Sequence, residues 1–144
     1  MNKIAKNTTS TIIPGMSYRN APKAIEWLCD TLGFEKHAVY PNADGTIILH
    51  AELTFGNGMI MLGSATTERD TVLKHPDEIG RANTRSVNLI ASDPDELYNR
   101  AKAAGAEIVL EIMDKHYGGR GFGVRDPEGH LWYVDSYDPW HAQP

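Results

Sequence analysis

The sequence predicts an α+β fold in which two βαβββ modules pair and their eight strands form an open, barrel-like cleft. Three observations support this class: an internal repeat, helix-capping residues that recur in both halves, and short strand-like runs separated by turn motifs. A shift of 72 residues aligns the segment from Pro22 to Gly33 with the segment from Pro94 to Gly105 without a gap. Identity between the halves is low, but the same physical devices recur in the same order. This recurrence indicates two copies of one module.

Each half carries one predicted helix, bounded by residues that start and stop helices. Asn20 and Ser92 can each accept a hydrogen bond from the free amides of a helical first turn. A proline follows each of them near the helix start, where its missing N–H costs little, and a glycine ends each helix in the left-handed conformation. Apolar residues recur at helical spacing between these signals. The two stripes are Ala21, Ala24, Ile25, Leu28 and Leu32, and Leu97, Ala101 and Ala104.

Strand-like runs surround each helix in the order strand, helix, three strands. They cover residues 11–18, 34–40, 46–55 and 59–63 in the first half, and 84–91, 107–112, 120–125 and 130–137 in the second. Turn motifs such as Gly56-Asn57-Gly58 and Asp126-Pro127-Glu128-Gly129 separate the strands.

These elements predict a single domain over residues 11–138. It consists of module 1 at 11–64, a polar linker at 65–83 and module 2 at 84–138. A four-stranded sheet covered by one helix buries only one face, so the other face needs a partner. The second module is the obvious candidate, and two curved sheets would enclose a cleft suited to a small ligand.

Composition excludes several classes of function. The 144 residues include 14 Lys and Arg against 19 Asp and Glu, a net charge of −5, and no basic run forms, which argues against a nucleic-acid partner. No window approaches the roughly 20 apolar residues of a membrane helix, and the polar N-terminus does not resemble a signal peptide. The single cysteine, Cys29, excludes an intramolecular disulfide framework and a Cys-rich zinc site. We expect a cytoplasmic protein without a membrane partner.

Two segments carry a resemblance to a known family. The run at 21–34, APKAIEWLCDTLGF, opens the first module, and the run at 117–132, YGGRGFGVRDPEGHLW, lies in the second. Together with the repeated module they resemble the vicinal oxygen chelate superfamily, which includes glyoxalase I, extradiol dioxygenases, fosfomycin-resistance proteins and bleomycin-resistance proteins. The second run is most similar to the bleomycin-resistance and PhnB-like branches. The resemblance implies modules that pair within one chain or are exchanged between two chains, and we therefore expect a homodimer.

The resemblance also implies where a metal would be held. Metal-dependent members place His, Glu or Gln ligands on the first and last strand of each module, and these positions correspond to Ile13, Met61, Ser86 and Tyr133. None is a usual ligand for zinc, iron, nickel or manganese. A slip of one residue does not restore the site, because it brings in Pro14, Arg85 or Val87, and Trp132. We therefore expect no metal and no other cofactor, as in the metal-free binding members.

His50 and Glu52 are the first candidate site residues. They lie two apart on a predicted strand, so their side chains leave the same face, roughly 6.5–7 Å apart along it. If that face lines the cleft, they form a hydrogen-bonding pair, an acid–base pair or two ligands of a non-standard metal site. The alternative is that the face is simply wetted by solvent. Ile47 and Leu49 alternate onto the opposite face with Ala51 and are expected to pack under the helix.

The second module supplies further candidates for the cleft wall. Tyr117 and Arg120 flank a glycine-rich turn, where backbone can approach a ligand and a guanidinium can hold a carboxylate or phosphate. The alternative for Arg120 is an ion pair with a nearby Asp or Glu. Strand alternation adds polar side chains, and methionines and an aromatic ring add an adaptable apolar lining, unless the methionines belong to the core. These residues are Ser86, Asn88, Tyr133, Met59, Met61 and Phe122.

The sequence thus predicts a metal-independent protein that binds a small organic molecule, resembling the sequestering bleomycin-resistance proteins. The alternative is a glyoxalase-like lyase or isomerase, with His50 and Glu52 as the catalytic candidates.

Overall fold

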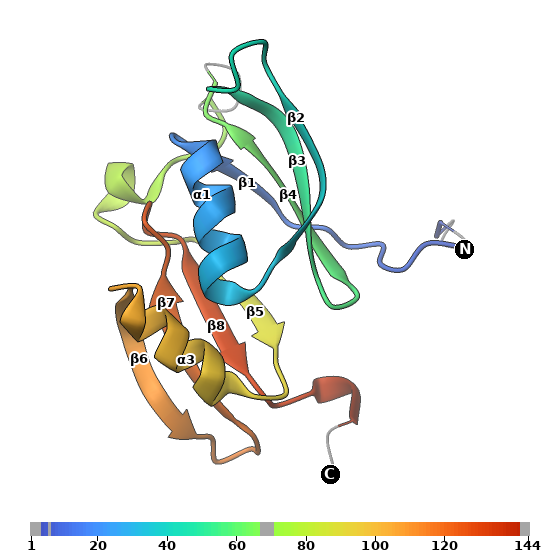
Figure 1. The fold of residues 1–144 in the computed structure, drawn as a ribbon. Coiled ribbons are helices and arrows are strands. Elements are labelled where there is room, and N and C mark those ends of the chain that lie inside the picture. The colour runs from blue at the N-terminus through green and yellow to red at the C-terminus, as the bar shows by residue number, and fades with distance from the viewer. Residues whose placement is uncertain (1–3, 6, 67–70, 142–144) are drawn as a thin grey trace.

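The computed structural model describes residues 4–5, 7–66 and 71–141 and confirms the predicted α+β class. Two modules, each a four-stranded sheet with one helix, lie next to each other (Figure 1). The elements of the first are β1 (Gly15–Tyr18), α1 (Ala21–Trp27), β2 (Glu35–Pro41), β3 (Ile48–Phe55) and β4 (Gly58–Ser64). Those of the second are β5 (Val87–Ile90), α3 (Pro94–Ala103), β6 (Glu107–Asp114), β7 (Arg120–Arg125) and β8 (Leu131–Asp135).

Both sheets have the same topology, as the repeat predicts. The strand orders are β1-β4-β3-β2 and β5-β8-β7-β6. In each sheet the first and last strands of the module pair in parallel, and the other neighbours are antiparallel. The first strand of each module is shorter than predicted. β1 begins only after Pro14, and β5 begins at Val87, whereas the predicted strands begin at residues 11 and 84. The sheets do not close into a barrel.

The helix boundaries follow the predicted capping chemistry with one correction. The Asn20 side chain accepts from the backbone N–H of Lys23 at 3.2 Å, as expected. In the second module Asp93, rather than Ser92, caps the helix and accepts from the N–H of Glu96 at 3.2 Å. The first helix continues through a π-helical turn, Leu28–Leu32, which ends at a left-handed glycine.

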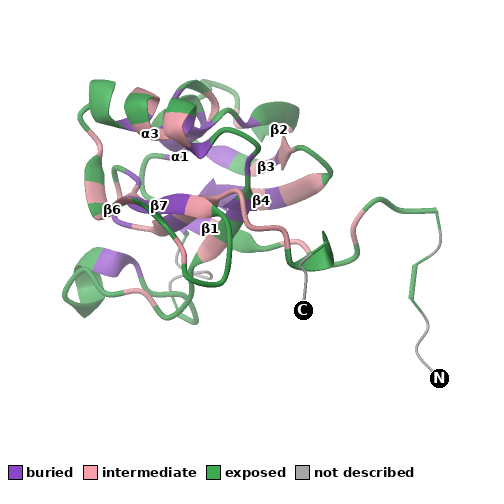
Figure 2. Ribbon diagram, turned by 90° about the horizontal axis from the view of Figure 1, so that it is seen from below, coloured by how far each residue is buried: buried purple, intermediate pink, exposed green. Residues whose placement is uncertain are grey.

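The helices cover one face of each sheet, and both lie on the same side of the molecule (Figure 2). Buried residues of the two modules form one continuous core beneath them. The rings of Phe34 and Trp132 meet edge to face across the module boundary, with centroids 5.6 Å apart. Because one face of each sheet is used in this way, the opposite faces stay open.

The structure corrects the expected core positions at the start of β3. Ile47 and Leu49 are exposed, Leu49 at 59%, whereas Ile48 is buried at 5%. The register between β2 and β3 shifts here, because Tyr40 pairs with His50 and Pro41 pairs with Ile48. The extra residue forms a β-bulge, which breaks the two-residue alternation on which the prediction relied.

The linker crosses the side of the molecule opposite the helices and contains a 3₁₀ turn, Pro76–Ile79 (Figure 2). Within the described ranges, no helix has the length and apolar character needed to cross a membrane.

Candidate ligand-binding site

The open face of module 1 carries a hydrogen-bonded pair of titratable side chains. His50 Nε2 lies 2.9 Å from Glu52 Oε2, and both residues are partly exposed. The Tyr40 ring stacks on the His50 ring at 6.0 Å, and His37 Nε2 lies 4.0 Å from Glu52 Oε1. Strand pairing places Met61 directly beside Glu52. The predicted pair is therefore assembled among an aromatic ring, a second imidazole and a thioether.

Strand alternation explains why these side chains point away from the helix. Ala51 and Leu53, the neighbours in sequence, are fully buried in the core on the other face. The Glu52 carboxylate can accept a hydrogen bond from the His50 imidazole N–H, or it can take up that proton. The arrangement can thus orient a polar ligand or exchange a proton with one.

The open face of module 2 presents a tyrosine ring laid across a glycine. A Cβ atom at Gly123 would lie 2.7 Å from Tyr133 Cε1 and 3.0 Å from Val109 Cγ2. Only a residue without a side chain leaves room for the ring at this place. Asn88 pairs with Tyr133 across the β5–β8 ladder, so a polar amide lies next to the aromatic surface. Tyr133 and Asn88 together form a platform for a flat or apolar group.

Phe122 does not belong to this face, which corrects the prediction. The residue is 1% exposed, and its ring meets Tyr98 of α3 edge to face at 5.3 Å. Along β7 the bulky residues Phe122 and Val124 point toward the helix, whereas Gly121 and Gly123 point toward the open face. The alternation of glycine with bulky apolar residues is the sequence signal that identifies the buried face.

Arg120 follows the alternative interpretation of an internal ion pair. Its Nε lies 3.0 Å from Asp95 Oδ2, and its Nη1 lies 3.3 Å from Asp114 Oδ1. The hydrogen bonds to Asp95 and then to Asp114 raise the pKa of the guanidinium. The neighbouring Gly119 allows a close approach of the protein's own backbone rather than of a ligand, because a Cβ atom there would lie 2.6 Å from the backbone nitrogen of Tyr137. Tyr117 packs against Tyr137 at 4.9 Å.

The residues at the expected metal positions do not fit a metal ion. The parallel ladders place Met61 beside Gly15 and Tyr133 beside Asn88, while Ser86 precedes β5. None of these side chains is an imidazole, carboxylate or thiolate. Among the residues that the structure describes, no cluster of three or more His, Cys, Asp or Glu could hold a metal elsewhere.

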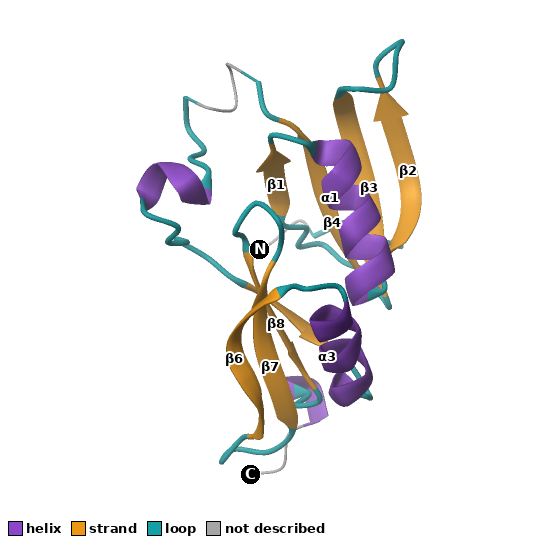
Figure 3. Ribbon diagram, turned by 60° about the vertical axis from the view of Figure 1, so that its left-hand side comes forward, coloured by secondary structure: helices purple, strands orange, loops and turns teal. Residues whose placement is uncertain are grey.

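Two hollows in the described part of the chain each contain only a few of the predicted residues. The two open faces point away from the helices, next to each other rather than toward each other (Figure 3). A hollow of about 260 Å³ between the modules is lined by Met59 and Asn88. A larger cavity of about 570 Å³ lies under the linker and includes Ser86. The sequence carries no local signal for this cavity, because segments that are distant along the chain form its walls.

Comparison with known proteins identifies a family model and a solved structure that each match most of the chain. A family model described as Glyoxalase/Bleomycin resistance protein/Dioxygenase superfamily matches residues 14–134. The crystal structure of TioX from Micromonospora sp. ML1 is 33% identical, with a TM-score of 0.69, and the alignment covers 88% of this chain and 94% of that one.

Two further proteins match at lower sequence identity. The fosfomycin resistance protein FosX of Listeria monocytogenes has a TM-score of 0.63 at 14% identity, and the alignment covers 90% of this chain and 92% of that one. An uncharacterized protein of Mycobacterium bovis is 27% identical over 130 residues, 90% of this chain and 84% of that protein. The likeness to FosX shows the fold alone.

Proposed function

Because this chain belongs to the Glyoxalase/Bleomycin resistance protein/Dioxygenase superfamily, we propose that it binds a small organic molecule without a metal ion. The ligand contacts the open faces of the two sheets. The observation that carries this proposal is that each open face holds an ordered group of side chains suited to contact a ligand. His50 and Glu52 supply polar contacts in module 1, and Tyr133 supplies an aromatic platform over Gly123 in module 2. A few polar groups set in an apolar and aromatic wall are the usual makeup of a ligand site.

A second copy of the chain completes this site. The open side of the molecule exposes large apolar residues, which monomers in water rarely gather on one surface. They include Tyr40, Leu49, Ile90, Val109 and Met113. A homodimer that laid module 1 of one copy against module 2 of the other would bury these residues and enclose both surfaces in one cleft. Sedimentation at micromolar concentration should therefore give twice the 15.9 kDa chain mass.

The electrostatics of the proposed site favour a neutral or cationic ligand. The chain carries a net charge of −5, and a long-range field of that sign favours positive partners. Arg120 does not oppose this preference, because Asp95 and Asp114 neutralise its charge locally. Glu52 adds an acceptor on the open face itself. We therefore place aromatic compounds that carry an amine or an amide first among the ligands to test.

Thermal unfolding with a panel of aromatic and glycopeptide-like compounds tests the proposal. A ligand at 100 times its dissociation constant should stabilise the protein by roughly 2.7 kcal/mol. Glu52→Gln and Tyr133→Ala should each weaken that binding by about tenfold, whereas Glu26→Gln, an exposed position on α1, should leave it unchanged. Binding that is equal in all four proteins would contradict the proposed site.

A second candidate function is lyase or isomerase chemistry, which the 2.9 Å contact between His50 and Glu52 favours. Such a pair can shuttle a proton at a carbon next to a carbonyl. His50→Gln and Glu52→Gln separate the two functions. For a binding protein these variants weaken affinity modestly, whereas for an enzyme they abolish turnover of a 2-oxoaldehyde–thiol adduct and leave its binding measurable.

A further inference from the structure

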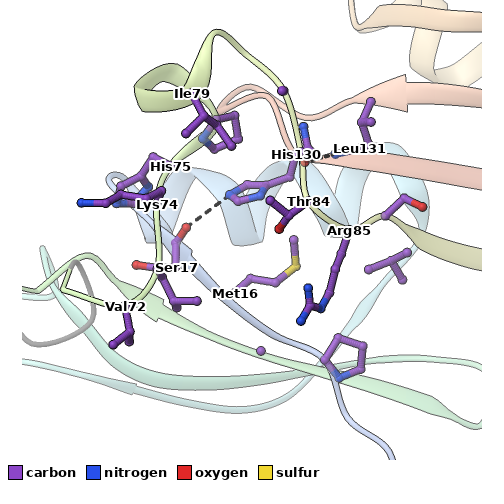
Figure 4. A pocket seen from close by; sticks show the side chains of 18 residues that line it. Met16, Ser17, Val72, Lys74, His75, Ile79, Thr84, Arg85, His130 and Leu131 are labelled. Atoms are coloured by element: carbon purple, nitrogen blue, oxygen red, sulfur yellow. Dashed lines mark hydrogen bonds between the residues drawn. The ribbon is translucent and has the colours of Figure 1, made fainter.

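We propose a second ligand site, for a small organic carboxylate, in the cavity beneath the linker. This site is separate from the open-face site and does not depend on it. The cavity measures about 570 Å³, within the range of pockets that hold small organic ligands. Its walls come from three places (Figure 4). They are residues 14–17 in and just before β1, residues 72–76, 79 and 82–87 in the linker and at the start of β5, and residues 130–131 where the chain enters β8.

The charge of the lining selects an anion. The described residues that line the cavity include Lys74, Arg85 and two histidines, and no aspartate or glutamate is among them. This is unusual on a chain with an excess of acidic residues. In the described part of the linker, Asp77 and Glu78 form ion pairs with Arg19 and do not line the cavity.

Arg85 is the cation placed to contact a ligand. Its side chain extends into the cavity beside Met16 (Figure 4). Over the described parts of the chain its guanidinium makes no ion pair, in contrast to Arg19, Arg81, Arg100, Arg120 and Arg125. A guanidinium offers two parallel N–H groups to a carboxylate, a geometry that a lysine cannot reproduce.

Ser17 provides the second polar anchor. It is 5% exposed, and its hydroxyl finds no hydrogen-bond acceptor or donor among the described residues, although it lines the cavity. A buried hydroxyl without a partner is unfavourable, and the oxygen of a bound carboxylate would satisfy it. The neighbouring His130 is held in place, because its Nε2 donates to the Ser17 carbonyl oxygen at 3.3 Å.

The rest of the lining suits an apolar ligand body. Val72, Leu73 and Ile79 are exposed in the chain by itself, and Leu131 and Met16 form the opposite side. An apolar group seated between them would remove this surface from water. The ligand is therefore an amphiphilic monocarboxylate, with its acid group at Arg85 and Ser17 and its alkyl or aryl part against the linker.

Calorimetric titration with 4-phenylbutyrate tests the site, with 4-phenylbutanol as the uncharged analogue. The acid should bind at least tenfold more tightly than the alcohol. Arg85→Gln should remove at least tenfold of the affinity for the acid, and Ser17→Ala at least threefold. Lys23→Gln, which deletes one positive charge from the exposed surface of α1, should change nothing. Melting temperatures of the variants show whether each remains folded.

The outcomes are distinguishable from those of the open-face site. Glu52→Gln should leave phenylbutyrate binding intact, whereas Arg85→Gln should leave the open-face ligand unaffected. Absence of binding to the wild-type protein, equal affinity for acid and alcohol, or equal effects of Arg85→Gln and Lys23→Gln would each overturn the carboxylate site without bearing on the open face.

Discussion

At the scale of single residues, Asp126 organises the junction between the modules. The residue is 4% exposed and accepts four hydrogen bonds. The Tyr18 hydroxyl donates to Oδ2 at 2.6 Å, and the Trp132 indole N–H donates to the same oxygen at 3.1 Å. The backbone N–H groups of Glu128 and His130 donate to Oδ1, each at 3.0 Å. The Asp-Pro-Glu-Gly turn thus connects the first strand of one module to the last strand of the other.

The Tyr18 phenol makes the stability of the protein sensitive to alkaline pH. Burial, followed by the charge of Asp126, raises the pKa of Tyr18 well above its usual value of 10.0. The unfolded chain loses this proton near pH 10, while the folded chain retains it. Its contribution is therefore complete below pH 10 and is lost as the pH rises toward the folded pKa, by up to about 1.4 kcal/mol per pH unit.

Tyr18→Phe removes this pH dependence together with one hydrogen bond. We expect lower stability than wild type at pH 7, by about 1–2 kcal/mol, and a smaller difference at pH 11. Urea unfolding at both pH values measures it, with Tyr117→Phe, which removes an exposed phenol, as the control. A difference that is constant between the two pH values would contradict the assignment.

The positions of single side chains were predictable where successive residues alternate regularly between the two faces of a strand. They were not predictable where a bulge interrupts this alternation. His50 and Glu52 share a face and touch, as their spacing predicts. Phe122 lies on the face opposite to the predicted one, although the alternation of Gly121 and Gly123 with bulky apolar residues indicates which face of β7 is buried. The prediction that Leu49 packs under the helix is wrong, because a β-bulge changes the side to which its side chain points. A bulge depends on the register with the neighbouring strand and leaves no local signal in the sequence.

At the scale of elements, the two glycines of β7 differ in what surrounds them. A Cβ at Gly121 would lie 2.5 Å from the Val134 carbonyl oxygen and 2.9 Å from the Asp135 Cα, both of which are backbone atoms of β8. A Cβ at Gly123 would meet side-chain atoms, chiefly those of the Tyr133 ring. A side chain can turn aside, whereas a paired strand cannot move without losing its ladder.

Alanine substitutions should follow this distinction. Gly121→Ala should destabilise the protein by about 3 kcal/mol and Gly123→Ala by about 1 kcal/mol, within the range for overpacked sites. Gly123→Ala should in addition weaken the open-face ligand, because it displaces the Tyr133 platform. Gly15→Ala is the matched control, since a Cβ there meets nothing within 4 Å. Equal costs for Gly121→Ala and Gly123→Ala, measured by urea unfolding, would show that the distinction between backbone and side-chain neighbours is wrong.

Element order was predictable because caps, turns and periodicity are local features of the chain. Both predicted helices and all eight predicted strands appear in the described part of the chain, in the predicted order. The π-helical turn at Leu28–Leu32 was not foreseen, since its apolar spacing is that of an ordinary helix. The cap at Asp93 was displaced by one residue, because Ser92 and Asp93 have equivalent capping chemistry.

At the scale of the whole molecule, the repeat predicted two modules but not how they meet. The patterns identify an apolar face on each sheet, and α1 and α3 cover those faces from the same side (Figure 3). Hydrophobic patterning alone does not say whether the remaining faces turn toward each other or toward another copy. The cavity under the linker could not be predicted from the sequence either, because three segments that are distant in sequence form it.

Glu128 is the contact that we expect to couple the modules most directly. Its Oε1 accepts from the backbone N–H of Arg19 at 2.7 Å, and its Oε2 accepts from that of Asn20 at 2.8 Å. The second module therefore binds the first at the point where β1 turns into α1. Hydrogen bonds to a charged acceptor are stronger than neutral ones, although solvent reaches this pair and reduces the gain.

Glu128→Ala should destabilise the protein by about 1–2 kcal/mol. Amide hydrogen exchange at Arg19 and Asn20 should accelerate by at least tenfold, while exchange in the centre of β3 should change only as far as global stability falls. Glu26→Ala removes an exposed carboxylate from α1 and is the matched control, with an expected effect of about 0.5 kcal/mol or less. If Glu128→Ala accelerates exchange equally throughout both modules, the carboxylate contributes only to overall stability. Faster exchange confined to the β1–α1 junction would instead show that the two repeats open against each other through this contact.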